Sequence, residues 1–185
     1  MPASGYRKDG KSMKAEAWHL HPIRVRYKET DAMGIVFHTN YMVWFEIGRT
    51  ELIRSAGYPY RRIEDEGLLL PVVDIDCAFH SPARYDDCLL ICTRVESYTP
   101  MRMAFRTQIR RLPIEPGDQL PVAYPPGEAD AAGAGLPGEL LVSGGTRHVW
   151  VGRDFKPARL DRRLPELYAF LKQHAGEPAR KGANR

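Results

Sequence analysis

The stretch YKETDAMGIVFHTNYMVWFEIGR, residues 27–49, decides the expected fold. Its polar first part carries Asp31, turns at Gly34 and leads into a helix. We expect this helix to begin near Thr39 or Asn40, because the side-chain oxygens of both suit an N-cap. Apolar residues then recur at the three- and four-residue spacing of a buried helix face: Tyr41, Trp44, Phe45, Gly48, Leu52 and Ile53. The stretch therefore predicts a carboxylate near the N-terminal end of a largely buried helix, where negative charge on a carbonyl oxygen is stabilised.

Period-two alternation predicts strands on both sides of this helix. One precedes it and four follow it, in the segments 23–27, 71–79, 89–96, 101–110 and 139–151. A short closing helix is expected at 164–172. Short links favour antiparallel pairing, and only the long helix is apolar enough to cover the inner face of the sheet. The predicted fold class is α+β: a long central helix wrapped by a curved antiparallel sheet of about five strands.

The 185 residues, of which 43% are apolar, suit one compact domain with a sizeable core. We expect this domain to span residues 18–175, between a flexible N-terminal extension at 1–17 and a flexible tail at 176–185. Residues 113–138 are rich in Pro, Gly and Ala without a sustained period, which predicts a long loop inserted into the domain. The net charge of +4 fits a partner that carries phosphates and fits an ordinary solvated surface equally well.

The cysteine pattern and the N-terminus favour a cytoplasmic protein. Cys77, Cys88 and Cys92 form neither a CxxC pair nor a zinc spacing, and an odd number of cysteines favours a reducing compartment. The N-terminal residues contain no apolar signal segment, and no stretch is long enough to cross a bilayer.

Single residues in the chain are weak evidence for chemistry. Asp31 in a TDAMG context is most simply a turn former, and His38 alone is most simply a structural hydrogen-bonding residue. The arginines at 102, 106 and 110 fit the solvated outer face of a strand as well as a phosphate contact.

The combination of motifs is far more specific than any of these residues. The ordered residues are Tyr27, TDAMGIVFH at 30–38, NY at 40–41, FE at 45–46, RTE at 49–51, HSPARYDD at 80–87 and TRHV at 146–149. With these motifs the chain resembles the hotdog-fold acyl-CoA thioesterases, in the branch that includes 4-hydroxybenzoyl-CoA thioesterase and the YbgC-like enzymes. The resemblance covers most of residues 20–170.

The resemblance implies hydrolysis of a thioester. Asp31 takes the place of the catalytic carboxylate, which acts as a nucleophile or as a general base towards water. The backbone N–H of His38 takes the place of the group that polarises the thioester carbonyl, while Gly34 and Asn40 shape the turn. This chemistry requires no metal and no cofactor, since coenzyme A is part of the substrate.

The implied substrate is an acyl group on coenzyme A or on an acyl-carrier protein, with neither nucleic acid nor membrane as a partner. The expected acyl pocket lies between helix and sheet near a dimer interface and is lined by Phe37, Tyr41 and Trp44. Candidate contacts for the nucleotide phosphates are Arg84, Arg102 and Arg106. Open sheet edges favour a homodimer, and the habit of the family extends this to a homotetramer.

Two other functions are compatible with the same scaffold. A hotdog dehydratase or hydratase uses a histidine and an acidic residue as an acid–base pair, and this sequence lacks that motif. A non-catalytic acyl-CoA-binding protein is the other alternative, against which the intact Asp31 argues. The insertion at 113–138 is longer than the tight hairpin usual in the family, so it could cap the site, alter the assembly or be inert.

Overall fold

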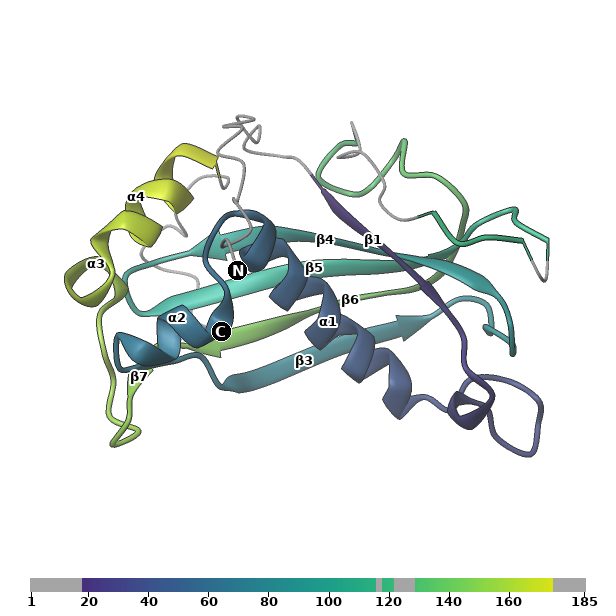
Figure 1. The fold of residues 1–185 in the computed structure, drawn as a ribbon, viewed down its shortest axis with the longest axis horizontal. Coiled ribbons are helices and arrows are strands. Elements are labelled where there is room, and N and C mark those ends of the chain that lie inside the picture. Colours follow the sequence, from purple (N-terminus) through teal and green to yellow (C-terminus); the bar gives the residue numbers. More distant parts are fainter. Residues whose placement is uncertain (1–17, 116–117, 122–128, 175–185) are drawn as a thin grey trace, which may run out of the picture.

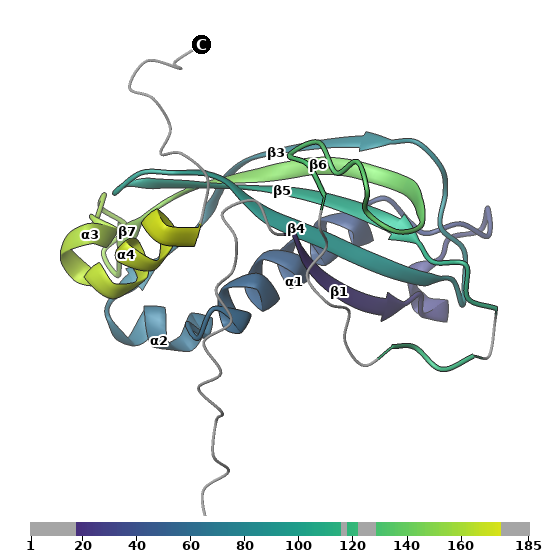
Figure 2. The same cartoon turned by 90° about the horizontal axis from the view of Figure 1, so that it is seen from above.

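A computed structural model describes residues 18–115, 118–121 and 129–174. One five-stranded antiparallel sheet, in the order β1-β4-β5-β6-β3, curves around the long helix α1 (Figures 1 and 2). The main elements are β1 (His19–Arg24), α1 (Thr39–Ser55), β3 (Val72–Phe79), β4 (Cys88–Tyr98), β5 (Arg102–Arg111) and β6 (Glu139–Val149). The predicted α+β class with one wrapped helix is therefore confirmed. The predictions of flexible ends at 1–17 and 176–185 concern residues outside the described part of the chain.

Smaller elements complete the two ends of the sheet. They are η1 (Tyr27–Glu29), α2 (Tyr60–Asp65), β2 (Leu68–Leu69), β7 (Val151–Gly152), α3 (Leu160–Arg163) and α4 (Pro165–His174). Strands β2 and β7 pair as a separate two-stranded sheet. Helices α3 and α4 lie at one end of the molecule, and the loop between β1 and α1 lies at the other (Figures 1 and 2).

The first strand ends earlier than its alternation predicts. We expected Tyr27 to be a strand residue, but β1 ends at Arg24 and Tyr27 starts the 3-10 helix η1 with 78% of its surface exposed. The chain turns here because the Glu29 N–H donates to the Arg26 carbonyl (3.0 Å) and the Glu29 carboxylate accepts the Arg26 N–H (2.7 Å).

The start of α1 is predicted correctly, but its N-cap is not. The helix begins at Thr39, and the N-cap position is His38, whose side chain makes no capping hydrogen bond. Tight main-chain bonds replace a side-chain cap: the Asn40 N–H donates to the Phe37 carbonyl (2.9 Å) and the Tyr41 N–H to the His38 carbonyl (3.3 Å).

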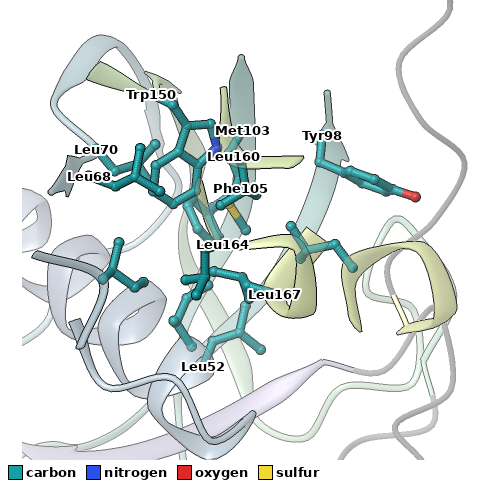
Figure 3. Packing of buried hydrophobic residues seen from close by; sticks show 13 residues of the cluster. Leu52, Leu68, Leu70, Tyr98, Met103, Phe105, Trp150, Leu160, Leu164 and Leu167 are labelled. Atoms are coloured by element: carbon teal, nitrogen blue, oxygen red, sulfur yellow. The ribbon is translucent and has the colours of Figure 1, made fainter. Parts of the chain in front are cut away.

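Helix α1 approaches the sheet very closely at Gly48. A Cβ placed on Gly48 would lie 2.7 Å from Ile91 Cγ2 and closer still to Thr93 Oγ1, both of which belong to β4. One apolar cluster on the N-terminal side of this contact includes Trp44 and Phe45. Another on the C-terminal side joins Leu52 and Ile53 of α1 to residues of α3, α4 and the sheet (Figure 3). Only glycine allows this approach, so Gly48 fixes the depth at which α1 packs.

We expect Gly48→Ala to lower the free energy of unfolding. Alanine improves helix propensity by about 1 kcal/mol, but crowding in a packed interior costs about 1–3 kcal/mol. Urea denaturation measures the net change. Thr93→Ala removes the nearest atom, so the same Gly48→Ala change should cost less in that background. A Gly48→Ala protein more stable than wild type would contradict the close contact.

A buried histidine lies on the helix-facing side of β6. His148 is 1% exposed, with Nδ1 3.2 Å from the Leu70 carbonyl oxygen and Nε2 2.8 Å from Thr146 Oγ1. These partners assign the proton to Nδ1, so that the threonine hydroxyl donates to Nε2. Burial, assisted by the charge of Arg49, lowers the pKa of His148 from 6.5 to about 4. The imidazole is therefore held neutral.

This neutral histidine makes stability depend on pH. The pKa of His148 is lower in the folded state, so its contribution is fully present above pH 6.5 and is lost as pH falls towards about 4. We expect a steeper loss of the free energy of unfolding for wild type than for His148→Gln in this window, by up to about 1.4 kcal/mol per pH unit. Urea denaturation at several pH values measures both slopes, and equal slopes would contradict the expectation.

The described parts of the insertion pack on the face of the sheet opposite α1. A third apolar cluster joins Leu136 to Trp18 and to the outward side chains of β4, such as Leu90 and Cys92. Polar bonds hold the segment as well: Gln108 Nε2 donates to the Ala132 carbonyl (2.6 Å). The described residues of 113–138 therefore cover the outer face of β1, β4 and β5. Residues 116–117 and 122–128 of the predicted loop lie outside the described part.

Candidate active site

The loop that carries Asp31 is short, and its two ends are paired. Thr30 and Val36 pair as an antiparallel bridge. Within it, the Asp31 N–H donates to the Ile35 carbonyl (2.9 Å) and the Gly34 N–H donates to the Asp31 carbonyl (2.9 Å). Gly34 has φ +72°, a conformation that costs glycine little and other residues more. The local sequence thus fixes the backbone on both sides of the carboxylate.

The Asp31 carboxylate is only partly used by the loop itself. Oδ1 accepts the Met33 N–H (2.8 Å), which closes an Asx turn. Among the residues that the structure describes, no donor bonds the second oxygen, Oδ2, which leaves it free to interact with a ligand.

The first turn of α1 offers unused donors next to this loop. The N–H groups of Asn40 and Tyr41 donate to the carbonyls of Phe37 and His38. Within the described part of the chain, the N–H groups of His38 and Thr39 have no hydrogen-bond acceptor. Such N–H groups at a helix N-terminus bind negative charge on an oxygen atom.

A cavity of about 360 Å³ brings the carboxylate and the helix N-terminus together. It is lined by the Asp31 loop, the first turn of α1 and the end of β3 with the residues that follow: Asp31, Met33, Ile35, Val36, His38, Tyr41, Phe79, His80, Ser81 and Pro82. The Tyr41 ring meets Phe79 edge-on at 5.5 Å, and its hydroxyl accepts the Ala83 N–H (3.2 Å). The cavity can thus hold an apolar group beside a carboxylate.

Comparison with known proteins identifies the family. The family model described as Thioesterase superfamily matches residues 33–116. A Bacillus subtilis protein named "Putative acyl-CoA thioesterase YneP" is 34% identical over 147 residues, which cover 79% of this chain and 89% of the relative. The chain belongs to the thioesterase superfamily.

Further relatives of this superfamily member agree in sequence and in fold. The acyl-CoA thioester hydrolase YbgC of Escherichia coli is 33% identical over 88 residues, or 48% of this chain and 66% of the relative. The crystal structure of DHNA-CoA thioesterase from Staphylococcus aureus superposes with a TM-score of 0.68 at 28% identity, covering 84% of this chain and 89% of that one. The predicted hotdog fold and the predicted family are both confirmed.

The structure places the predicted catalytic pair and one predicted pocket residue together. Asp31, His38 and Tyr41 all line the cavity of this superfamily member. Gly34 forms the turn between Asp31 and His38, as the sequence suggested. The side chain of Asn40 donates to the carbonyls of Glu29 (2.9 Å) and Phe37 (3.2 Å), which fits its predicted role in shaping the turn.

The other two aromatic candidates lie outside the cavity lining. Phe37 is 45% exposed and its ring packs on the His38 ring at 4.3 Å. Trp44 is 1% exposed, and its indole Nε1 donates to the Glu29 carboxylate (3.4 Å). Their predicted contacts with an acyl group stay predictions.

The three predicted arginines occupy different parts of the surface. Arg84 is exposed and follows Ala83, whose carbonyl accepts the Val36 N–H (2.8 Å), so it lies beside the Asp31 loop. Arg102 is exposed at the start of β5, paired opposite Val149, and does not line the cavity. Arg106 is on the outer face of the sheet.

Arg106 has carboxylate partners there. It forms ion pairs with Glu96 and with Asp76 (3.3 Å) and is absent from the cavity lining. The structure thus brings Arg84 near the candidate site and leaves Arg102 and Arg106 away from the cavity.

Reasoning from single residues gave no role to Phe79 and Ser81, which line the cavity, and did not predict that Glu29 is buried. The resemblance included the segment 80–87, but it gave no role to Ser81, and Phe79 carried only the signal of an apolar residue in an alternating strand. Glu29 carried no signal, because an acidic residue before a turn is ordinarily exposed. In the structure it is 3% exposed.

No site for a metal ion is evident in residues 18–115, 118–121 and 129–174, where no three His, Cys, Asp or Glu side chains form a suitable group. Across the same residues, no helix has the length and apolar character needed to cross a membrane. None of the described residues of the insertion lines the cavity.

Proposed function

We propose that this protein hydrolyses acyl-CoA thioesters to a free carboxylic acid and coenzyme A. The proposal rests on one observation: a carboxylate with a free oxygen and a helix N-terminus with unused N–H groups line the same cavity. Membership of the thioesterase superfamily and the names of the relatives support the substrate class.

In the proposed mechanism, the thioester carbonyl oxygen accepts the backbone N–H of His38. Charge that develops on this oxygen in the tetrahedral transition state is stabilised by that donor and by the helix N-terminus. Asp31 either attacks the carbonyl carbon, expelling the coenzyme A thiolate and leaving an acyl anhydride that water hydrolyses, or removes a proton from an attacking water.

The acyl group would occupy the cavity against Tyr41 and Phe79, whose rings offer apolar surface. Arg84, beside the loop, is the proposed contact for a phosphate of the carrier, since a guanidinium binds phosphate oxygens well. An acyl-carrier protein carries the same phosphopantetheine arm and is the alternative carrier. The proposed reaction proceeds without a metal or an added cofactor.

We further propose that the active protein is at least a homodimer, paired along β3. This strand is an edge of the sheet, and it exposes Val73, Ile75 and Phe79 to 57%, 42% and 56%. A free apolar edge strand favours pairing with a second copy. Since Phe79 also lines the cavity, the cavity would then lie next to the partner. We propose further that two such dimers form the homotetramer that the family resemblance implies.

We expect Ile75→Asp to shift the protein towards monomer, because a charge on the paired edge opposes burial of that edge. Sedimentation velocity measures the assembly. Met101→Asp is the matched control, since Met101 is equally apolar and 40% exposed, but lies in the turn between β4 and β5. An Ile75→Asp protein that sediments like the control would contradict pairing through β3.

We expect Asp31→Asn to lower kcat by roughly 10²-fold or more, since the amide is neither a nucleophile nor a base. Thiol release from a panel of acyl-CoAs measures activity. Asp65→Asn, a carboxylate at the end of α2, is the matched control and should behave as wild type. Unchanged turnover in Asp31→Asn would remove Asp31 from the mechanism, while a wild type inactive on every thioester would overturn the proposed function.

A further inference from the structure

We propose that Glu29 is the positioning residue that holds Asp31 and the His38 N–H in reacting geometry. This inference rests on the proposed function. Glu29 is the acidic residue two positions before Asp31, and it is 3% exposed. It does not line the cavity, so it would act through its neighbours and not on the substrate.

The carboxylate of Glu29 binds both ends of the segment that leads to the site. It accepts the main-chain N–H of Arg26 (2.7 Å) and the Arg26 guanidinium through Nη2 (2.7 Å) and Nε (3.1 Å), where β1 has just ended. It also accepts the indole N–H of Trp44 (3.4 Å), in the second turn of α1. Burial by itself raises the pKa of Glu29, but the bonds from Arg26 and Trp44 outweigh it and hold that pKa below its ordinary value. The group is therefore a buried anion tied to both segments.

The main-chain carbonyl of Glu29 forms a second set of bonds, to the returning part of the loop. It accepts the Phe37 N–H (2.9 Å) and the side-chain amide of Asn40 (2.9 Å). One residue thus ties the end of β1, the start of α1 and the chain between Asp31 and His38.

These bonds set the relation between the two proposed catalytic groups. Asp31 follows Glu29 by two residues, and His38 directly follows Phe37, which is bonded to Glu29. A shift of Glu29 therefore moves the carboxylate and the oxyanion donor relative to each other. The aromatic side of the cavity is held by other contacts, because the Tyr41 hydroxyl accepts the Ala83 N–H and the Tyr41 ring packs on Phe79. Loss of the Glu29 anion should accordingly affect the chemical step more than substrate binding.

The chain provides a matched control for a purely structural role. Arg54 and Glu51 of α1 form an ion pair with the same three-residue spacing and a similar distance (3.1 Å). That pair lies about four turns along the helix from His38 and does not line the cavity. Glu29→Gln and Glu51→Gln therefore make the same chemical change, one at the proposed positioning residue and the other in an ion pair away from the site.

The test is steady-state thiol release by wild type, Glu29→Gln, Glu51→Gln and Asp31→Asn with the best acyl-CoA substrate. For Glu29→Gln we expect kcat to fall roughly tenfold to a hundredfold, the size of effect that a displacement of about 1 Å produces. Its KM should stay within about twofold of wild type. Glu51→Gln should keep the wild-type kcat.

A second readout does not depend on turnover. In Glu29→Gln, hydrogen exchange at the amides of Val36 and Phe37 should quicken, while the amides at the centre of β4 and β5 keep their protection. Should Glu29→Gln fail to fold, Arg26→Ala removes the guanidinium bonds at a side chain that is 61% exposed, and a smaller fall in kcat at constant KM is expected.

Clear outcomes would overturn the inference. It fails if folded Glu29→Gln keeps the wild-type kcat, if Glu51→Gln loses as much, or if KM rises while kcat is unchanged. If one of these results is found while wild type is active and Asp31→Asn is inactive, only the role of Glu29 is rejected and the proposed function stands. If wild type hydrolyses no thioester, the proposed function fails and this inference fails with it.

Discussion

The close contact of α1 with β4 at Gly48 is the constraint on which the rest of the structure depends. With a hydrogen atom as side chain, the middle of the helix reaches the Thr93 and Ile91 side chains, and apolar clusters close the interface on both sides. A helix is stiff, so fixing its middle also fixes its ends. The N-terminal end then lies by the last residues of β3, and the C-terminal end lies against α3 and α4 (Figures 2 and 3).

The candidate site forms at the N-terminal end of α1, where the Asp31 loop meets the residues that follow β3. The main chain of Ala83 joins them, since its carbonyl accepts the Val36 N–H and its N–H donates to the Tyr41 hydroxyl. The Asp31 loop is closed from within by its own turn bonds. It is attached to the helix through Glu29, whose burial as an anion is compensated by Arg26 and Trp44. Rigid attachment of this kind is what a preorganised oxyanion site requires.

The outer face of the sheet is covered by apolar residues on one side and carries ion pairs on the other. Leu136 and its neighbours cover the outer face of β1, β4 and β5, while Arg106 and Arg147 form ion pairs with carboxylates over β3 and β6. Strand β3 keeps an open edge, and its apolar side chains Val73, Ile75 and Phe79 are exposed in the described chain. The proposed pairing with a second copy along this edge would cover them.

The sequence by itself determined the elements whose signal is local. The three- and four-residue spacing of apolar residues predicted α1, period-two runs predicted the strands, and the TDAMG motif predicted the loop with its glycine turn. Only the tertiary structure decided which side chains those elements bring together. Burial of Glu29, the place of Phe79 in the cavity, the pairing of Arg106 with Asp76 and the covering of the outer face all join residues distant in the chain or depend on such packing. The N-cap was missed for the same reason: Asn40 has a partner in Glu29, eleven residues earlier, that no helix rule contains.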